Sequence, residues 1–453
     1  MVELFAGPRA MLRTASSFRV TGRVSDVLGL SVIAEGLPIP VGAMCAIETR
    51  SGQCIPAQAV GTRGDRTILM TLRDPAGLSV RDRVTSRAGL QFVPVGRGML
   101  GAVLNGLGEP IGGNTAYLAE AHYPVFADPP HALTRKSIDR PLPTGIRAID
   151  ALHTFGGGQR MGIFAGTGVG KSVLLGMIAR STAADVIVVA LIGERGREVG
   201  DFLRKDIGDA MSRCVMVVST ADESPVLRVR AGFVATAVAE YFRDQGQDVL
   251  LLLDSTTRIA MAQRQVGLSA GEPPTTKGYP PSVFALLPKL LERSGRTNHG
   301  SITGLYTVLV EGDDLTEPIA DSIRGILDGH LWLARDLANR AHYPAIAVLE
   351  SISRVMPDVV GPQHLEAAAT LRKVLASWRD VEDLVNVGAY VPGANPDFDL
   401  AVKLRPAIDQ FLQQGIPERC DFAVTRGRLL ELAGQANALR EKLAAQAGGQ
   451  PKE

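Results

Sequence analysis

The sequence predicts an α/β protein with a small N-terminal β-barrel, a central domain with a mostly parallel sheet, and a C-terminal helical domain. From Phe18 to about Phe92, short apolar and β-branched runs alternate with turn pairs such as Ser51-Gly52, which is typical of a small closed barrel. From Met161 onward, continuous apolar strands alternate with helices, as in a parallel sheet covered on both faces. Beyond about Gly361 the strand patterns stop and helical periodicity takes over.

These changes of pattern divide the chain of 453 residues into four segments. Residues 1–17 precede the barrel at 18–93, the central domain spans 94–360, and the helical domain spans 361–453. We expect the barrel to hold neighbouring subunits together. Two interpretations stay open for residues 1–17, a short amphipathic helix and a frayed terminus. The apolar and basic residues that suggest the helix are Leu4, Phe5, Arg9, Met11, Leu12 and Arg13.

Composition narrows the class of protein. The 48 basic and 47 acidic residues give a net charge of +1, so no global field would draw the chain to nucleic acid or to an anionic membrane. The longest apolar runs, such as Val186–Ile192, are far shorter than the ~20 residues that cross a bilayer. The N-terminus lacks the apolar core of a secretory signal, and the seven histidines include no HExxH. The cysteines form no CxxC pair, as expected for reduced thiols in the cytosol; they are Cys45, Cys54, Cys214 and Cys420.

The stretch Met161–Ile178, MGIFAGTGVGKSVLLGMI, has the strand, loop and helix order of a phosphate-binding loop. Its glycines would let backbone N–H groups converge on phosphate oxygens at a helix N-terminus. Lys171 would reach the β- and γ-phosphates, and Ser172 would ligate Mg²⁺. Ala165 stands where the pattern GxxxxGK[ST] has its first glycine, so we expect ordinary strand dihedrals there. The loop residues are Gly166, Thr167, Gly168, Val169, Gly170, Lys171 and Ser172.

Further strands and helices follow this loop. Ser224 and Pro225 have the pattern of an N-cap and first-turn proline, and the helix they begin should end near Gly246. The strands that we expect in this part are Val186–Gly193, Cys214–Thr220, Val249–Asp254, a strand that begins at Ser301, and Pro344–Leu349. The helices that we expect are Arg197–Ile207 and one over Pro280–Gly295 that bends at Pro288.

Two carboxylates come at the ends of predicted strands, where open α/β sheets gather their ligand-binding residues. Asp254 closes the strand Val249–Asp254 and is placed to hold Mg²⁺ through water. Glu194 is our candidate to polarise the attacking water, with Arg195 and Glu198 as neighbours. Spacing alone leaves open whether this charge cluster is catalytic or merely solvated.

Two more candidate site residues flank the predicted strand Pro344–Leu349. Tyr343 precedes the strand, and Arg354 follows it. Arg354 could neutralise charge that develops on the γ-phosphate, and Tyr343 offers an aromatic face that could stack on adenine. An exposed surface arginine and a partly buried core tyrosine are the alternative interpretations.

From about Phe18 to about Gln414 the chain resembles the flagellar protein-export ATPases, relatives of the type III secretion ATPases and of the rotary ATP synthase catalytic subunit. The most specific stretch is Asp254–Gly295, DSTTRIAMAQRQVGLSAGEPPTTKGYPPSVFALLPKLLERSG. The alanine ahead of GTGVGKS also fits the export branch. The segments VNVGAYVPGANPDFD and FLQQGIPER resemble flagellar members more than injectisome members.

The resemblance implies a RecA-like P-loop ATPase domain in a homohexamer, with ATP and Mg²⁺ bound between subunits. It gives Glu194 the role of catalytic carboxylate, Arg354 that of an arginine finger acting in trans, and Tyr343 the adenine-stacking position. Arg195 and Arg258 occupy family positions close to the phosphates.

The implied partners are a stator-like regulator that binds the N-terminal segment, a coiled-coil stalk protein, export chaperone–substrate complexes and the membrane export gate. The N-terminal segment is then expected to be a docking helix, and the protein to be cytoplasmic and peripherally associated with the export apparatus. Two alternatives are an injectisome ATPase and a hexameric RNA motor, and the near-zero charge and lack of a basic, aromatic-rich stretch argue against RNA binding. The carboxylate at Glu194 argues against a non-catalytic ring subunit.

Overall fold

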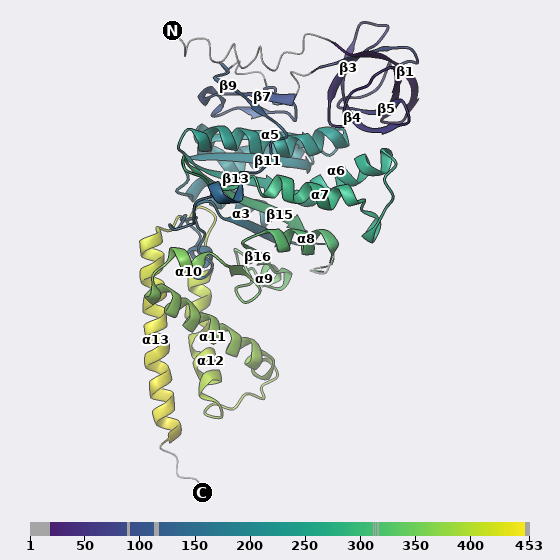
Figure 1. Ribbon diagram of the computed structural model, residues 1–453. Helices are drawn as coiled ribbons and strands as arrows, with labels where there is room; N and C mark the ends of the chain where they lie inside the picture. Colours follow the sequence, from purple (N-terminus) through teal and green to yellow (C-terminus); the bar gives the residue numbers. More distant parts are fainter. Residues whose placement is uncertain are drawn as a thin grey trace, which may run out of the picture.

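The structure, a computed structural model, describes residues 19–448 except 88–90, 113–116, 311, 313, 315 and 316. It shows a barrel at one end, a central domain built on a sheet, and long helices that extend away from the sheet (Figure 1). The docking helix expected within residues 1–17 lies outside the described residues. The expected boundaries at 17, 93 and 360 stay a prediction.

The barrel predicted from the spaced β-rich runs is confirmed. Six antiparallel strands close in the order β1-β2-β5-β4-β3-β6, and alternating apolar side chains such as Val32 and Leu69 fill the interior. β4 was not among the predicted runs, because Pro56, Gly61 and a register shift between Ala59 and Gly61 break its pattern. The strands are β1 (Thr21–Leu28), β2 (Ser31–Glu35), β3 (Met44–Glu48), β4 (Cys54–Arg63), β5 (Arg66–Thr71) and β6 (Arg83–Ser86).

The central sheet has nine strands in the order β17-β16-β10-β15-β13-β11-β12-β8, with β14 paired to β15. Its inner pairs are parallel, and only β14 and β17 pair antiparallel to their neighbours. The strands are β8 (Val103–Leu104), β10 (Arg160–Ala165), β11 (Val186–Glu194), β12 (Cys214–Thr220), β13 (Asp248–Asp254), β14 (Gly295–Arg296), β15 (Ser301–Leu309), β16 (Gly329–Leu333) and β17 (Ile352–Ser353).

Both faces of this sheet are buried, as the continuous apolar strands predicted. In β13, Leu250 and Leu252 join the hydrophobic cluster on the α3 face, and Leu251 and Leu253 join the cluster under α5. The helices of this domain are α2 (Arg147–Leu152), α3 (Lys171–Ser181), α4 (Gly196–Asp201), α5 (Pro225–Asp244), α6 (Thr256–Ser269), α7 (Pro281–Leu291), α8 (Pro318–Ile326), α9 (Arg335–Asn339) and α10 (Met356–Val359). A π-helical turn η5 (Phe202–Ile207) and the 3₁₀ turn η6 (Gly208–Arg213) continue α4.

The start of α5 confirms the predicted cap. The Ser224 hydroxyl accepts a hydrogen bond from the backbone N–H of Leu227, and Pro225 is the first helical residue. A small sheet of β7 (Phe92–Val95) and β9 (Ala121–Pro124) packs on α5, outside the barrel (Figure 1). The remaining short turns are η3 (Arg97–Met99), η4 (Ala132–Thr134) and η7 (Thr276–Gly278).

The expected strand at Pro344–Leu349 is wrong. These residues are apolar and mostly buried, but Ile346 N–H turns back to the Pro344 carbonyl at 2.8 Å, so only an isolated bridge joins Ile346 to Leu333. The strand in this region is β16, Gly329–Leu333. A buried apolar run alone cannot distinguish a strand from an irregular buried segment.

The C-terminal part is helical, as predicted. α11 (Pro362–Asn386), α12 (Pro396–Leu412) and α13 (Phe422–Gly448) pack on one another and on α2. Arg147 of α2 is 4% exposed and donates hydrogen bonds to the Phe411 carbonyl and to Glu418. No helix in the described ranges is long and apolar enough to cross a bilayer.

Candidate active site

The phosphate-loop motif joins the carboxyl end of β10 to the first turn of α3. Gly168 and Gly170 have φ values of 78° and 87°, the left-handed region that glycine adopts without strain. Ala165, the last residue of β10, keeps strand geometry, and its carbonyl accepts a hydrogen bond from Val310 N–H at 3.0 Å. The predicted strand geometry of Ala165 is therefore confirmed. The positive φ values that favour glycine occur only later in the loop.

Lys171, Glu194 and Asp254 converge at the carboxyl edge of the sheet. Lys171 Nζ forms an ion pair with Asp254 Oδ1 and lies 3.9 Å from Glu194 Oε1. The three side chains are 13%, 12% and 4% exposed. The adjacent strands β11 and β13 carry the two carboxylates, so the prediction that strand ends would collect them into one site agrees with this geometry.

The environment of Glu194 changes its acidity. Burial is the main cause that raises its pKa to about 7; the nearby charge of Asp254 also raises it, and Lys171 opposes both. A carboxyl group with this pKa can exchange a proton with water near neutral pH.

Two residues that the sequence did not suggest also contact the site. Thr307 Oγ1 donates to Asp254 Oδ1 at 2.7 Å from β15, the strand between β10 and β13. Arg335 Nη1 donates to the Thr167 carbonyl in the loop at 3.1 Å. A threonine inside a strand carries no distinguishing sequence signal. Arg335 could have been found, because it comes just after the carboxyl end of β16, but that strand was not predicted.

Ser172 and Asp254 present oxygen donors suited to Mg²⁺, a hydroxyl at the exposed start of α3 and a carboxylate. No cluster of three or more His, Cys, Asp or Glu side chains within the described ranges could hold a metal by itself. The donor set therefore fits a magnesium ion whose remaining ligands are water and phosphate oxygens.

Arg195, Glu198 and Arg258 lie around Glu194 in different ways. Arg195 is 83% exposed and pairs with Glu198 at 3.7 Å. Arg258, in α6, packs its aliphatic stem against Gly193, where an added Cβ would lie 3.1 Å from the Arg258 Cβ. Its Nε is buried without a hydrogen-bond partner among the described residues.

Tyr343 and Arg354 lie at opposite ends of the sheet. The Tyr343 ring is next to the loop, because a Cβ at Gly170 would lie 3.5 Å from it, and the side chain is partly exposed. Arg354 follows β17, whose Ser353 pairs with Gly329 at the beginning of β16, whereas Leu333 at the end of β16 pairs with Ala165. The exposed Arg354 is therefore at the amino edge, far from the loop of its own chain.

Comparison with known proteins identifies the family. The ATP synthase alpha/beta family, nucleotide-binding domain, matches residues 145–353, and the T3SS EscN ATPase C-terminal domain matches residues 360–431. The flagellum-specific ATP synthase of Bacillus subtilis is 46% identical over 428 residues, which cover 93% of this chain and 97% of that protein. The chain belongs to the flagellar and type III secretion ATPases.

Other members of the family agree with this assignment. The flagellum-specific ATP synthase of Salmonella typhimurium is 49% identical and covers 91% of this chain and 93% of that protein. A structure of the assembled ATPase EscN from the enteropathogenic E. coli type III secretion system superposes with a TM-score of 0.86 at 43% identity, over 91% of this chain and all of that chain. The predicted family and the three-part fold are confirmed, and the chain is an ATPase.

Proposed function

We propose that this ATPase serves the flagellar protein export apparatus, where a hexameric ring couples Mg-dependent ATP hydrolysis to the delivery or unfolding of export substrates. The convergence of Lys171, Glu194 and Asp254 beside the phosphate loop carries the proposal, together with family membership. The segments VNVGAYVPGANPDFD and FLQQGIPER favour the flagellar system over an injectisome.

Each residue of the site has a role in this proposal. The loop amides and Lys171 bind the phosphates, and Ser172 and Asp254 would hold Mg²⁺, which would neutralise charge on the phosphate oxygens. Glu194 orients the attacking water and takes up its proton. Arg258 and Arg195 bind phosphate oxygens near the reaction, and Tyr343 stacks on adenine.

Arg354 completes the site of the neighbouring subunit. Because it lies at the amino edge of the sheet, opposite its own loop, one subunit can present its loop and the next its Arg354 to the same nucleotide. An arginine finger of this kind contributes about 10³–10⁵ in rate.

The proposed partners follow from the family. The assembled EscN, and EscN in complex with its central stalk EscO, which superposes with a TM-score of 0.84 at 42% identity, support a homohexamer with a coiled-coil stalk. A stator-like regulator would bind residues 1–17, and export chaperone–substrate complexes and the membrane export gate would be the further partners. The protein would then work in the cytoplasm at the membrane-bound apparatus.

The catalytic assignment is tested with Glu194→Gln. We expect this variant to bind ATP with parental affinity and to lose at least ~100-fold of its turnover, because its amide cannot take up a proton. Phosphate release and equilibrium nucleotide binding measure the two properties. Glu109→Gln, which changes an exposed carboxylate paired with Arg73 and Asn105, is the matched control. Parental turnover in Glu194→Gln would contradict the mechanism.

The cellular role is tested by complementation. In a flagellate host that lacks its export ATPase, the wild-type chain should restore secretion of flagellar subunits and Glu194→Gln should not. Restoration of effector secretion in an injectisome mutant, without restoration of flagellar export, would favour the type III alternative instead.

A further inference from the structure

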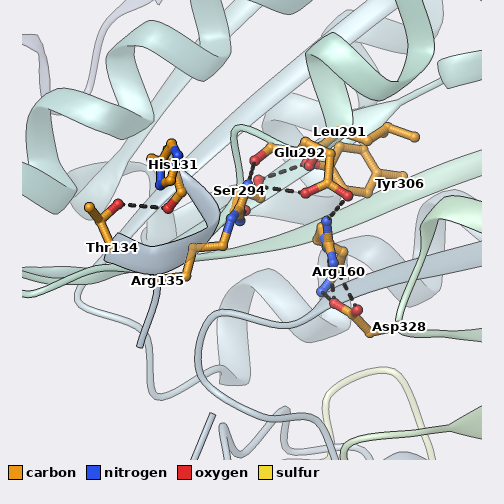
Figure 2. Close-up of polar contacts among 9 residues, drawn as sticks. All are labelled: His131, Thr134, Arg135, Arg160, Leu291, Glu292, Ser294, Tyr306 and Asp328. Atoms are coloured by element: carbon orange, nitrogen blue, oxygen red, sulfur yellow. Dashed lines mark hydrogen bonds and ion pairs between the residues drawn. The ribbon is translucent and has the colours of Figure 1, made fainter. Parts of the chain in front are cut away.

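A row of alternating charges crosses the amino edge of the central sheet (Figure 2). Arg135 Nη2 bonds Glu292 Oε2 at 3.0 Å, and the other oxygen of Glu292 forms an ion pair with Arg160. Arg160 in turn binds Asp328 in bidentate fashion, with Nη2 to Oδ1 at 2.9 Å and Nε to Oδ2 at 3.0 Å. Figure 2 shows the four side chains converging from separate segments of the chain.

Each member of this row marks the end of a different element. Arg135 follows η4, Glu292 follows α7, Arg160 begins β10, and Asp328 immediately precedes β16. The side chains are 17% to 35% exposed, so solvent screens the row only in part. The bidentate pair of Arg160 and Asp328 fixes the relative orientation of the two side chains as well as the distance between them.

Asp328 is held by both its side chain and its backbone. The Asp328 Oδ2 atom also accepts the backbone N–H of Arg160 at 3.0 Å, and the Asp328 N–H donates to the Arg160 carbonyl at 2.9 Å. The Asp328 carbonyl accepts the backbone N–H of Arg354 at 3.0 Å. The backbone position of Arg354 therefore depends on Asp328, which depends on Arg160.

The chain just before Arg354 is also fixed. β17 contains only Ile352 and Ser353, so the ladder itself holds this segment weakly. The Ser353 hydroxyl donates to the Thr154 carbonyl at 2.9 Å and accepts from Gln159 Nε2 at 3.0 Å, and all three residues are buried. The exposed Arg354 side chain thus extends from a short, well-supported turn.

We infer that Asp328, oriented by Arg160, is a positioning residue for Arg354 and so controls the active site of the neighbouring subunit. This inference rests on the proposed function, in which Arg354 acts in trans. The geometry also offers a path by which Asp328 acts on the nucleotide site of its own subunit, because Arg160 begins β10 and β10 ends at the phosphate loop of the same chain. The test must therefore show on which side of the subunit boundary the defect lies.

The first measurement uses Asp328→Asn, which keeps the size of the side chain but loses the charge through which Arg160 orients this residue. Because a ~1 Å displacement of a positioned group can cost about 10²-fold, we expect kcat to fall about 10- to 100-fold while KM for ATP changes less than ~3-fold. Asp328→Glu, which retains the charge, should recover part of the loss. Asp139→Asn is the control, because it removes a carboxylate whose side chain is 65% exposed and which pairs with Arg296.

The second measurement uses mixed rings, made by co-expression of two differently tagged variants and purified through both tags. Asp328→Asn subunits mixed with Glu194→Gln subunits should regain turnover, because a Glu194→Gln subunit supplies an intact Arg354 to its neighbour's intact carboxylate. Asp328→Asn mixed with Arg354→Ala should regain no turnover above that of Asp328→Asn alone, because neither variant supplies a positioned arginine.

The outcomes separate the two proposals. Rescue by Arg354→Ala but not by Glu194→Gln would place the defect in the subunit's own nucleotide site and overturn the inference. Wild-type turnover of Asp328→Asn, with Arg354→Ala inactive, would also overturn it and leave the proposed function intact. Failure of the Arg354→Ala and Glu194→Gln mixture to regain turnover, in rings shown to be mixed, would instead overturn the trans arginine and the proposed function. Loss of ring assembly or nucleotide binding by Asp328→Asn would show that the Arg160–Asp328 ion pair has a structural role, and would count against the inference.

Discussion

Asp254 receives two hydrogen bonds on a single oxygen atom, one from Lys171 and one from Thr307. We predict that Thr307→Val raises the Mg²⁺ concentration needed for half-maximal ATP turnover by about 10- to 100-fold, because a lost hydrogen bond to a charged group costs roughly 1.5–3 kcal/mol. Titration of ATP turnover with Mg²⁺ measures the effect. The shape of valine is close to that of threonine, so the buried strand should stay packed.

Thr303 offers a matched control four residues earlier on the same strand and face. Its Oγ1 accepts a hydrogen bond from the Gly158 backbone N–H at 2.8 Å, remote from the site. Thr303→Val should lower the free energy of unfolding by about 1–3 kcal/mol, because a buried donor is left unpaired, and leave the magnesium dependence unchanged. An equal change in magnesium dependence in both variants would contradict a role for Thr307 at Asp254.

Ala165 gives a second prediction at the scale of one residue. Because Ala165 has strand geometry and needs no positive φ, Ala165→Gly should keep turnover within about twofold and lower stability by roughly 0.5–1 kcal/mol. Gly170→Ala should weaken nucleotide binding, because φ is 87° there and an alanine adopts this left-handed conformation only with strain. Equilibrium binding of a fluorescent ATP analogue and thermal unfolding distinguish the two effects. A loss of binding in Ala165→Gly would show that the side chain itself is required.

The site residues that sequence could predict are those with a fixed local context. Lys171 and Ser172 follow from the loop motif, and Glu194 and Asp254 from their places after apolar strands. Thr307, by contrast, meets Asp254 only because β15 lies between β10 and β13 in space. That strand order is set by tertiary packing and leaves no local trace in the chain.

The end of helix α2 supplies a prediction at the scale of an element. His153, the C-cap residue of α2, is fully buried, and burial is the main cause that lowers its pKa to about 3, with Arg372 adding to the effect. The unfolded chain binds a proton at this histidine below about pH 6.5 whereas the folded chain does not. Burial of this histidine therefore costs no stability above pH 6.5. As the pH falls to 5, protonation of the unfolded chain lowers the free energy of unfolding by about 2 kcal/mol.

Urea denaturation between pH 7 and pH 5 measures this contribution. His153→Leu should flatten the pH dependence by up to about 1.4 kcal/mol per unit, and His122→Gln, at an exposed position, should leave the dependence as it is. An unchanged slope in His153→Leu would show that the imidazole is charged or accessible in the folded protein.

Elements were predictable where one periodicity held over their whole length. The helix beginning at Pro225 combines a cap, a first-turn proline and a long apolar face, and it forms as α5. The segment Pro344–Leu349 satisfies only the apolar criterion, and it bends back on itself beside β16. β16 itself is five residues long and contains Gly329 and His330, so its short pattern gave too little signal.

At the scale of the whole molecule, changes in periodicity along the chain are enough to predict the succession of a barrel, a sheet domain and a helical domain. These changes do not predict the separation of Arg354 from Lys171, because it depends on β17 pairing antiparallel at the beginning of β16 while the loop leaves the end of β10. The resemblance to export ATPases assigns Arg354 the role of an arginine finger acting in trans, independently of the geometry. The geometry adds a reason why a single subunit cannot use both residues on one nucleotide.

This arrangement predicts that nucleotide promotes assembly. A non-hydrolysable ATP analogue held by the loop of one subunit and by Arg354 of the next binds the assembled state more tightly than the monomer. Mass action therefore shifts the equilibrium toward rings, by an amount set by the ratio of the two affinities. Light scattering over a range of protein concentrations should show the midpoint of assembly fall when the analogue is present. Arg354→Ala should bind the analogue and show a much smaller shift, because the contact across the boundary is lost, and Arg379→Ala, which removes an exposed arginine paired with Glu350, should behave as wild type. An equal shift in Arg354→Ala and wild type would mean that the nucleotide acts within one subunit, and the shared site would have to be abandoned.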